Sequence, residues 1–169
     1  RENMAAFKTL DDLGDVTGKV ALVRVDLNLP MKDGSATDLT RVEAVKPTIL
    51  ELSERGAKVL LLAHFGRPKG QRSSVLSTSM VVGDVEGVLA KEIMFIPEVS
   101  GDVVKQSIGI LRDGDIGLLD NTRFWPGEEA NDADFVKAIA ANGDFYVNDA
   151  FSAAHRAHAT TEGLAHLLP

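Results

Sequence analysis

The sequence predicts a doubly wound α/β fold, in which a parallel sheet carries helices on both faces. Five short and nearly continuous apolar runs recur along the chain, and segments with helical spacing of apolar residues separate them. Runs of Val, Leu and Ile without polar alternation are typical of strands buried on both faces, as in parallel sheets. The alternation of strands with helices favours right-handed crossovers and a Rossmann-like architecture.

The predicted strands are the apolar runs themselves. Each run ends abruptly at glycine or at polar residues, which is expected where a buried strand leaves the sheet. The strands are predicted at residues 19–25, 58–63, 93–96, 116–120 and 145–147.

The first predicted helix follows the first strand. Apolar residues fall at helical spacing between Val42 and Leu52, and Gly56 stands where a helix would be capped at its carboxyl end. Pro47 interrupts this pattern. The helix is therefore either kinked at Pro47 or begins later than Arg41.

Three further helices are expected. Residues 103–111 have an amphipathic pattern, and Asp132 stands as a capping residue before another apolar helical set. Residues 76–90 form a weaker helical segment, because two glycines lower its helix propensity. No linker or repeat interrupts the 169 residues, so we expect one domain.

Composition excludes several classes of function. The chain has no cysteine, which rules out disulfides, thiolate catalysis and cysteine-based zinc sites. Its net charge of -7 argues against general binding to nucleic acid or to anionic membranes. No apolar run approaches the roughly 18 residues of a membrane span, and no signal-peptide pattern opens the chain. We therefore expect a cytoplasmic protein without nucleic-acid or membrane partners, in which residues 1–3 ahead of Met4 are foreign additions.

Polar residues gather where the predicted strands end. Ligands of open α/β sheets bind beyond the carboxyl ends of the strands. Guanidinium groups pair with carboxylate and phosphate oxygens, so this edge suits a small molecule with more than one anionic group. One arginine after a strand is most often a solvated loop charge, and Asp26 and Asn28 could simply brace a turn. The candidate binding residues are Asp26, Asn28, Arg41, His64, Arg67, Arg123 and Arg156.

Two other kinds of site are disfavoured. His155 and His158 have a spacing that could place two imidazoles on a metal, but no cysteine or nearby carboxylate completes a ligand set. Neither the G-x-x-x-x-G-K-[ST] loop nor a G-x-G-x-x-G loop after the first strand is present. The sequence thus predicts no metal site, and it disfavours a Rossmann-type oxidoreductase.

Five blocks of the sequence resemble one known family. They are VRVDLNLP, the pair Thr40 and Arg41, AHFGRPKG, NTRFWPGEEAND and YVNDAFSAAHRAHATT. In this order they are similar to the amino-terminal half of the phosphoglycerate kinases. The resemblance implies reversible phosphoryl transfer between 1,3-bisphosphoglycerate and ADP, which yields 3-phosphoglycerate and ATP in glycolysis.

The resemblance also assigns roles to the candidate residues. Asp26 and Asn28 would hold the hydroxyl and carboxylate end of the glycerate. Arg41 would be the catalytic arginine, which points at the transferring phosphoryl group and stabilises its charge. The phosphate that stays on the substrate would be bound by a basic patch of His64, Arg67, Arg123 and Arg156.

The same resemblance implies that this chain is half of an enzyme. Residues 4–169 would form the substrate-binding amino-terminal domain, and the carboxyl-terminal domain that binds Mg-ATP or Mg-ADP would be absent. The chain alone would then hold no cofactor and show no kinase activity. The sequence departs from the family pattern at Asp120, usually Glu, at Trp125, usually smaller or more polar, and at Ser152, commonly Gly.

Two alternative functions belong to other classes of protein. One is a stand-alone, non-catalytic module that binds a phosphorylated metabolite. The other is a receiver-like α/β domain with a cation site, which needs paired acids after the first strand and an aspartate after the third. The basic character of the strand ends disfavours the receiver.

Overall fold

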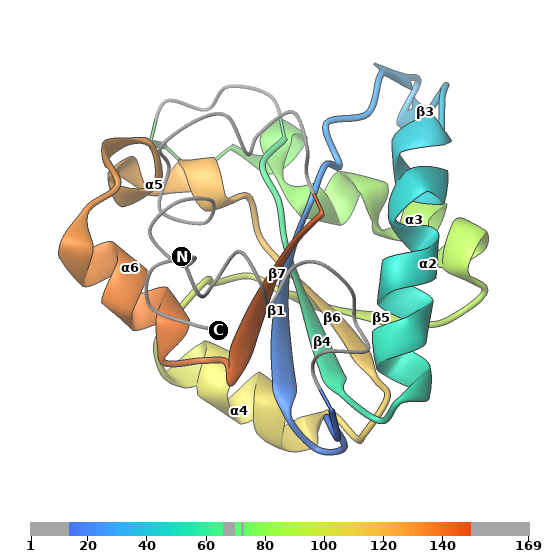
Figure 1. Cartoon of the computed structure of the whole chain (residues 1–169). Coiled ribbons are helices and arrows are strands. Elements are labelled where there is room, and N and C mark those ends of the chain that lie inside the picture. Colours follow the sequence, from blue (N-terminus) through green and yellow to red (C-terminus); the bar gives the residue numbers. More distant parts are fainter. Residues whose placement is uncertain (1–13, 66–69, 72, 150–169) are drawn as a thin grey trace.

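The computed structural model describes residues 14–65, 70–71 and 73–149, and its centre is a five-stranded parallel sheet (Figure 1). The strands lie in the order β5-β6-β4-β1-β7. Their bounds are β1 Val20–Val25, β4 Lys58–Leu62, β5 Ile93–Ile96, β6 Ile116–Leu119 and β7 Phe145–Asp149. All five predicted strands are confirmed, with ends that differ by at most two residues.

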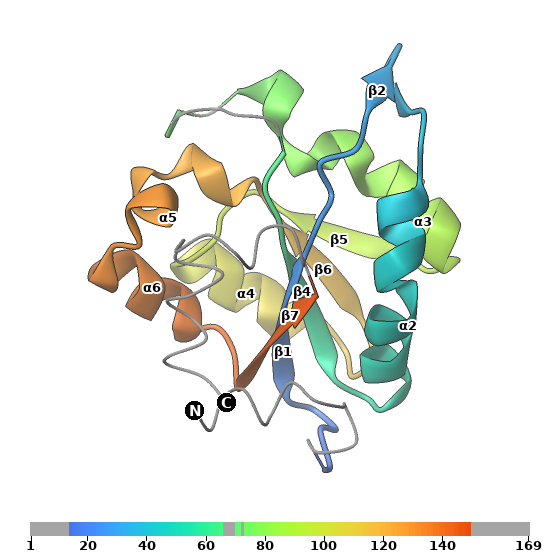
Figure 2. The ribbon, with the colours of Figure 1, turned by 45° about the horizontal axis from the view of Figure 1, so that its top comes forward.

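Helices cover both faces of this sheet, which confirms the doubly wound fold. One face packs against α2 (Thr40–Glu54) and α3 (Val82–Leu89). The other packs against α4 (Asp102–Ile110) and α6 (Ala133–Ala140). Figures 1 and 2 show these two layers on opposite sides of the strands.

Strand β1 shows how successive residues supply the two cores. Ala21 and Val23 belong to the core beneath α2, whereas Leu22 belongs to the core beneath α4 and α6. Side chains of a strand alternate between its faces, so a strand between two helix layers must be apolar at nearly every position. Arg24 is the exception in β1, and it is fully buried.

Helix α2 begins at Thr40, so the second of the two alternatives, a start later than Arg41, is wrong. Pro47 lies inside the helix on its exposed side, together with Glu43 one turn earlier. Proline has no N–H to donate to the carbonyl of Glu43, and because this side of the helix is exposed, that carbonyl is close to water. Gly56 follows the helix with φ of 88°, in the left-handed region where glycine carries no steric penalty, as predicted for a carboxyl cap.

The segment predicted as one helix over residues 76–90 is divided. Two short 3-10 turns, η2 (Ser74–Leu76) and η3 (Thr78–Val81), precede α3. The reason is a polar anchor: the side chain of Thr78 donates to the carbonyl of Leu119 at the end of β6, at 2.9 Å. This bond to β6 keeps η2 and η3 as separate turns, so they do not continue the helix α3 toward its amino end.

A small hairpin and two short helical elements were not predicted. A hairpin of β2 (Met31–Lys32) and β3 (Ser35–Ala36) turns through Asp33 and Gly34, both with positive φ, and projects beyond α2 (Figure 2). The Asp-Gly pair is a known hairpin signal. The turn η4 (Thr122–Phe124) and the short helix α5 (Pro126–Ala130) follow β6, and Pro126 at the first helical position was the available signal for α5.

The order of the strands fixes where a ligand site is expected. The chain leaves β4 through α3 on one face, and it leaves β6 through α5 and α6 on the opposite face. Because β4 and β6 are neighbours, their loops diverge at the carboxyl edge of the sheet. Crevices at such a switch point are the common binding sites of open α/β sheets.

Candidate functional site

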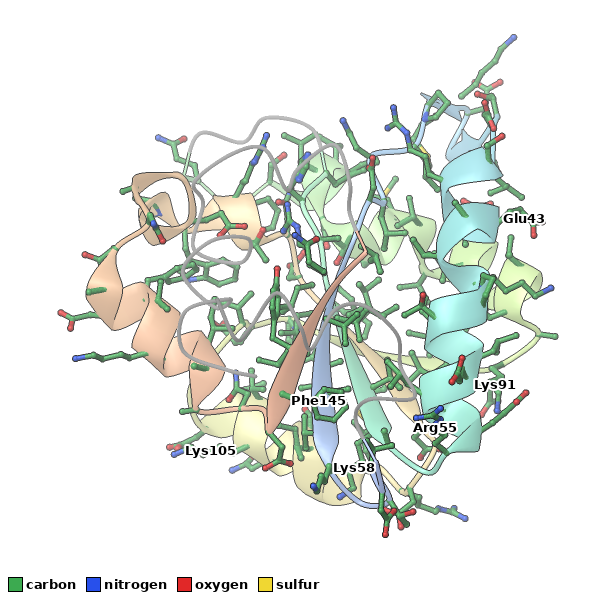
Figure 3. All side chains as sticks on the ribbon, in the orientation of Figure 1. Glu43, Arg55, Lys58, Lys91, Lys105 and Phe145 are labelled. Carbon is green, nitrogen blue, oxygen red and sulfur yellow. The ribbon has the colours of Figure 1, made fainter. Side chains whose placement is uncertain are left out.

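The predicted site residues that the structure describes lie at the end of the sheet opposite to where its strands begin. Phe145 and Lys58, the first residues of β7 and β4, are both at the bottom of Figure 3. Lys105 of α4 lies at that lower end as well. The carboxyl ends of the strands therefore lie at the top, where nitrogen and oxygen atoms of side chains gather above β1 and β7.

Asp26, Asn28 and Arg41 form a contact cluster just beyond β1. The guanidinium of Arg41 donates to the carbonyl of Asn28, and its Nε lies 3.7 Å from Oδ2 of Asp26. The other carboxylate oxygen of Asp26 accepts from the backbone N–H of Asn28 at 3.1 Å. The Arg41 side chain is 50% exposed and that of Asp26 is 19% exposed, so the cluster faces solvent on one side.

His64 follows the neighbouring strand β4, which ends at Leu62. Arg24 of β1 is paired in register with Leu62 of β4. Asp26 and His64 each come two residues after that pair, so they lie at the same level of the carboxyl edge. His64 is half-buried.

Arg123 reaches this edge from the loop after β6. The backbone N–H of Thr122 donates to the carbonyl of Ala63, directly before His64, at 3.0 Å. The carbonyl of Arg123 accepts from the N–H of Gly70 at 3.0 Å. These two bonds hold the loop after β4 against the loop after β6, and Arg123 is itself buried.

Asn121 and Asp120 reinforce this junction. The side-chain amide of Asn121 donates to the carbonyls of Phe65 and Leu76, at 2.6 and 2.8 Å. One carboxylate oxygen of Asp120 accepts from the Ser77 hydroxyl at 2.8 Å, from the Thr78 N–H at 3.1 Å and from the Asn121 N–H at 2.7 Å.

The aspartate at position 120 is therefore part of the structural support of the site. It is buried and satisfies three donors from two segments. A glutamate would place its carboxylate one methylene farther out, so the short acid found here suits the close approach of η3 to the end of β6. Trp125, another departure, is half-buried and packs its ring 6.1 Å from that of Phe124.

Arg24 is a residue of this edge that the sequence analysis missed. Its Nη1 donates to Oγ1 of Thr122 at 3.3 Å and to Oε2 of Glu128 at 3.2 Å, and the side chains of Arg24 and Glu128 are both 0% exposed. Its Nη2 lies 2.8 Å from Nδ1 of His64. The available signal was an arginine inside an apolar strand, because a buried cation requires a partner.

Tyr146 of β7 adjoins the same pair of charges. Burial raises the pKa of its phenol well above the usual range, the positive charge of Arg24 opposes that shift, and the negative charge of Glu128 adds to it. The phenol therefore stays protonated wherever the chain is folded at ordinary pH.

Several predicted residues lie outside the described part of the chain. These are Arg67, Arg156, Ser152 and the histidines at 155 and 158. Within residues 14–65, 70–71 and 73–149, no three histidine or carboxylate side chains converge as a metal site. The same residues contain no helix that is both long enough and apolar enough to cross a bilayer.

Comparison with known proteins decides the family. The profile of the phosphoglycerate kinase family matches residues 10–169, which is nearly the whole chain. This chain belongs to the phosphoglycerate kinase family. A phosphoglycerate kinase of Sphingopyxis alaskensis is 61% identical over 166 residues, and one of Rhizobium johnstonii is 63% identical over the same length.

Solved structures of the family confirm the fold. The structure of phosphoglycerate kinase from Pyrococcus horikoshii matches 94% of the chain with a TM-score of 0.83 and 32% identity. That from Coxiella burnetii matches 88% with a TM-score of 0.77 and 33% identity. The chain spans 42% of the Sphingopyxis relative, 41% of the Rhizobium relative and 40% of the Pyrococcus chain.

Proposed function

We propose that this chain is the 3-phosphoglycerate-binding part of a phosphoglycerate kinase. The enzyme would transfer a phosphoryl group reversibly between 1,3-bisphosphoglycerate and ADP. The observation that carries the proposal is the convergence of Asp26, Asn28, Arg41, His64 and Arg123 on one edge of a sheet whose family is established.

The substrate suits the chemistry of this edge. A glycerate phosphate presents a carboxylate, a hydroxyl and a phosphate. Asp26 and Asn28 offer oxygen and amide groups for the hydroxyl and carboxylate end, while His64 and Arg123 offer donors for the phosphate. Arg67 and Arg156, which the sequence predicts for the same phosphate, complete the proposed patch.

Arg41 is the proposed catalytic residue. Its half-exposed guanidinium already contacts Asp26 and Asn28, which places a cation beside the proposed carboxylate subsite. The transferring phosphoryl group is attached to that carboxylate in 1,3-bisphosphoglycerate. A fixed guanidinium there stabilises the negative charge that spreads over the phosphoryl oxygens during transfer.

The nucleotide is proposed to bind in the part of the enzyme that this chain does not span. Its relatives are more than twice as long, which leaves room for a second domain. Mg²⁺ held with the nucleotide supplies charge neutralisation to the transfer. We propose that the 169 residues alone have no kinase activity, because positioning of both reactants accounts for much of such catalysis. A cytoplasmic location follows from the proposed place in glycolysis.

Calorimetry with 3-phosphoglycerate tests the proposal. The chain is expected to bind this ligand, and Arg67→Ala or Arg156→Ala is expected to weaken binding about ten- to a hundredfold by removing a charged donor. Lys105→Ala is the matched control, because Lys105 lies at the opposite end of the sheet (Figure 3). Unchanged affinity in both arginine variants, or an equal loss in the lysine variant, would contradict the assignment.

A further inference from the structure

The contact between Arg24 and His64 determines which imidazole nitrogen carries a proton. Nη2 of Arg24 lies 2.8 Å from Nδ1 of His64, which is hydrogen-bonding distance. A guanidinium has five donors and no acceptor, and it stays protonated in proteins. Nδ1 must therefore be the acceptor and carry no proton.

We propose that Arg24 is a positioning residue, which holds His64 as the neutral tautomer with its proton on Nε2 and presents that N–H to the substrate. The identity of the substrate rests on the proposed function, whereas the tautomer rests only on the contact within the chain. Arg24 would act through His64 and would not touch the ligand.

The burial of the two side chains gives the orientation of the ring. Arg24 is fully buried and His64 is half-buried, so the nitrogen bonded to Arg24 faces the interior. The two nitrogens of an imidazole lie on different sides of the ring. Nε2 consequently lies away from Arg24, toward the more exposed side of the ring.

The partners of Arg24 make this arrangement rigid. Its Nη1 is bonded to Glu128 at 3.2 Å and to Thr122 at 3.3 Å, so both terminal nitrogens of the guanidinium are engaged. Glu128 comes from α5 and Thr122 from η4, which tie β1 to the loop after β6. A buried ion pair with this geometry resists rotation because either charge left alone would be strongly penalised.

The neutral tautomer would give the site a directional donor of constant charge. Protonation of His64 at Nδ1 would set an N–H against the N–H of Arg24 and add a second positive charge. His64 would then contribute hydrogen-bond geometry, and the arginines would contribute charge. The charged side chains of the described elements around this part of the edge are Arg24 from β1, Asp26 beyond it, Arg41 from α2, Arg123 from η4 and Glu128 from α5.

Nitrogen NMR of the ¹⁵N-labelled chain tests the tautomer directly. The spectrum is recorded at about pH 6, where an ordinary histidine is largely protonated on both nitrogens. His64→Gln identifies the His64 signals among those of the 4 histidines. We expect an unprotonated Nδ1 and a protonated Nε2 in the wild type; a protonated Nδ1 would overturn the proposal.

Matched variants test the role of Arg24. Arg24→Met combined with Glu128→Leu removes both buried charges together, and His64 should then be largely protonated on both nitrogens at the same pH. Glu128→Gln is the control, because its amide oxygen can still accept from Arg24, and it should keep the wild-type signature. If the double variant folds and keeps a neutral His64, Arg24 is not the positioning residue. If the double variant does not fold, the wild-type spectrum alone decides whether His64 is the neutral tautomer with its proton on Nε2.

Addition of 3-phosphoglycerate separates this proposal from the proposed function. The Nε2 signal of His64 should shift as the ligand saturates. If other signals shift and the Nε2 signal does not, the substrate does not use this N–H and the proposal fails. If no signal shifts at all, the proposed function fails while the tautomer stands on the ligand-free spectrum.

Discussion

The ion pair of Arg24 and Glu128 shows how single residues support the site at a cost to the fold. Both side chains are fully buried, and a buried ion pair often contributes no more stability than apolar residues of the same volume. The ion pair instead positions other residues of the site, because Arg24 also contacts His64 and Thr122 at the start of η4. The pair is therefore expected to tolerate joint replacement better than single replacement.

Stability measurements on three chains test this expectation. Arg24→Met alone leaves Glu128 without its ion-pair partner in the interior and should lower the free energy of unfolding by about 3–5 kcal/mol. Adding Glu128→Leu should recover most of that loss. Urea denaturation gives both values; a single variant as stable as the double variant would contradict the account.

Tyr146 gives the folded chain a predicted sensitivity to alkali. Its folded pKa is raised, so the folded state keeps a proton that the unfolded state loses. Its contribution to stability is complete below the unfolded pKa of about 10 and is lost as the pH rises above that value. Tyr146 is the only tyrosine, so phenolate absorbance reports on this one group.

Absorbance and unfolding should thus change together in an alkaline titration. We expect the phenolate signal to appear only as the chain unfolds, and Tyr146→Phe to reduce the loss of unfolding free energy above about pH 10. Circular dichroism recorded on the same samples follows unfolding. A phenolate signal that rises near pH 10 in the folded chain would show that Tyr146 is not protected.

At the scale of elements, close packing at the sheet limits which glycines can be replaced. Gly143 lies just before β7, and a Cβ placed there would lie 2.4 Å from Cγ of Leu22 in the middle of β1. Leu22 is fully buried, so it has little room to move. Gly87 lies inside α3 on its exposed side, and a Cβ there would meet nothing within 4 Å.

Alanine at these two glycines should act in opposite directions. Gly143→Ala should lower the free energy of unfolding by about 1–3 kcal/mol through overpacking. Gly87→Ala should raise it by about 0.5–1 kcal/mol, because alanine is the better helix former. Thermal unfolding of both variants is the check, and equal shifts in the same direction would argue against the described packing of β7 on β1.

The elements also show why the sequence predicts most of the fold but not the division of residues 76–90, the hairpin or α5. Long apolar runs and helical spacing predict the five strands, α2, α4 and α6, since burial on fixed faces imposes that spacing. The division of residues 76–90 depends on the bond from Thr78 to the end of β6, which has no local signal. The hairpin and α5 are too short for periodicity, although Asp33-Gly34 and Pro126 marked them.

Sequence reasoning found candidate residues at the carboxyl edge of the sheet, but it did not find the buried residues that contact them. Asp26, Asn28, His64 and Arg123 come soon after strands, so the rule for carboxyl ends of parallel sheets finds them. Arg41 is included because it begins the segment after the first loop. Arg24 and Glu128 act through contacts that span 40 or more residues of sequence, such as Arg24 to His64 and Arg24 to Glu128. No spacing along the chain encodes those pairings, and only the folded structure brings them together.

At the scale of the whole molecule, one end of the sheet carries the proposed chemistry and the other end does not. The parallel arrangement places the carboxyl ends of all five strands of the central sheet on one side. The loops after β4 and β6 diverge there and are joined by the bonds of Thr122, Gly70 and Asn121. A glycerate phosphate is therefore expected to bind at one end of the molecule alone.

Amide NMR of the ¹⁵N-labelled chain during titration with 3-phosphoglycerate measures this most directly. If the substrate binds at the carboxyl edge, saturable shifts of the amide signals are expected for residues 26–28, for His64 and for residues 121–124. Residues 55–58 and 112–115, which lie where β4 and β6 begin, should stay unchanged. Shifts confined to those lower segments, or no saturable shift at any concentration tested, would contradict the assignment of this edge as the substrate site.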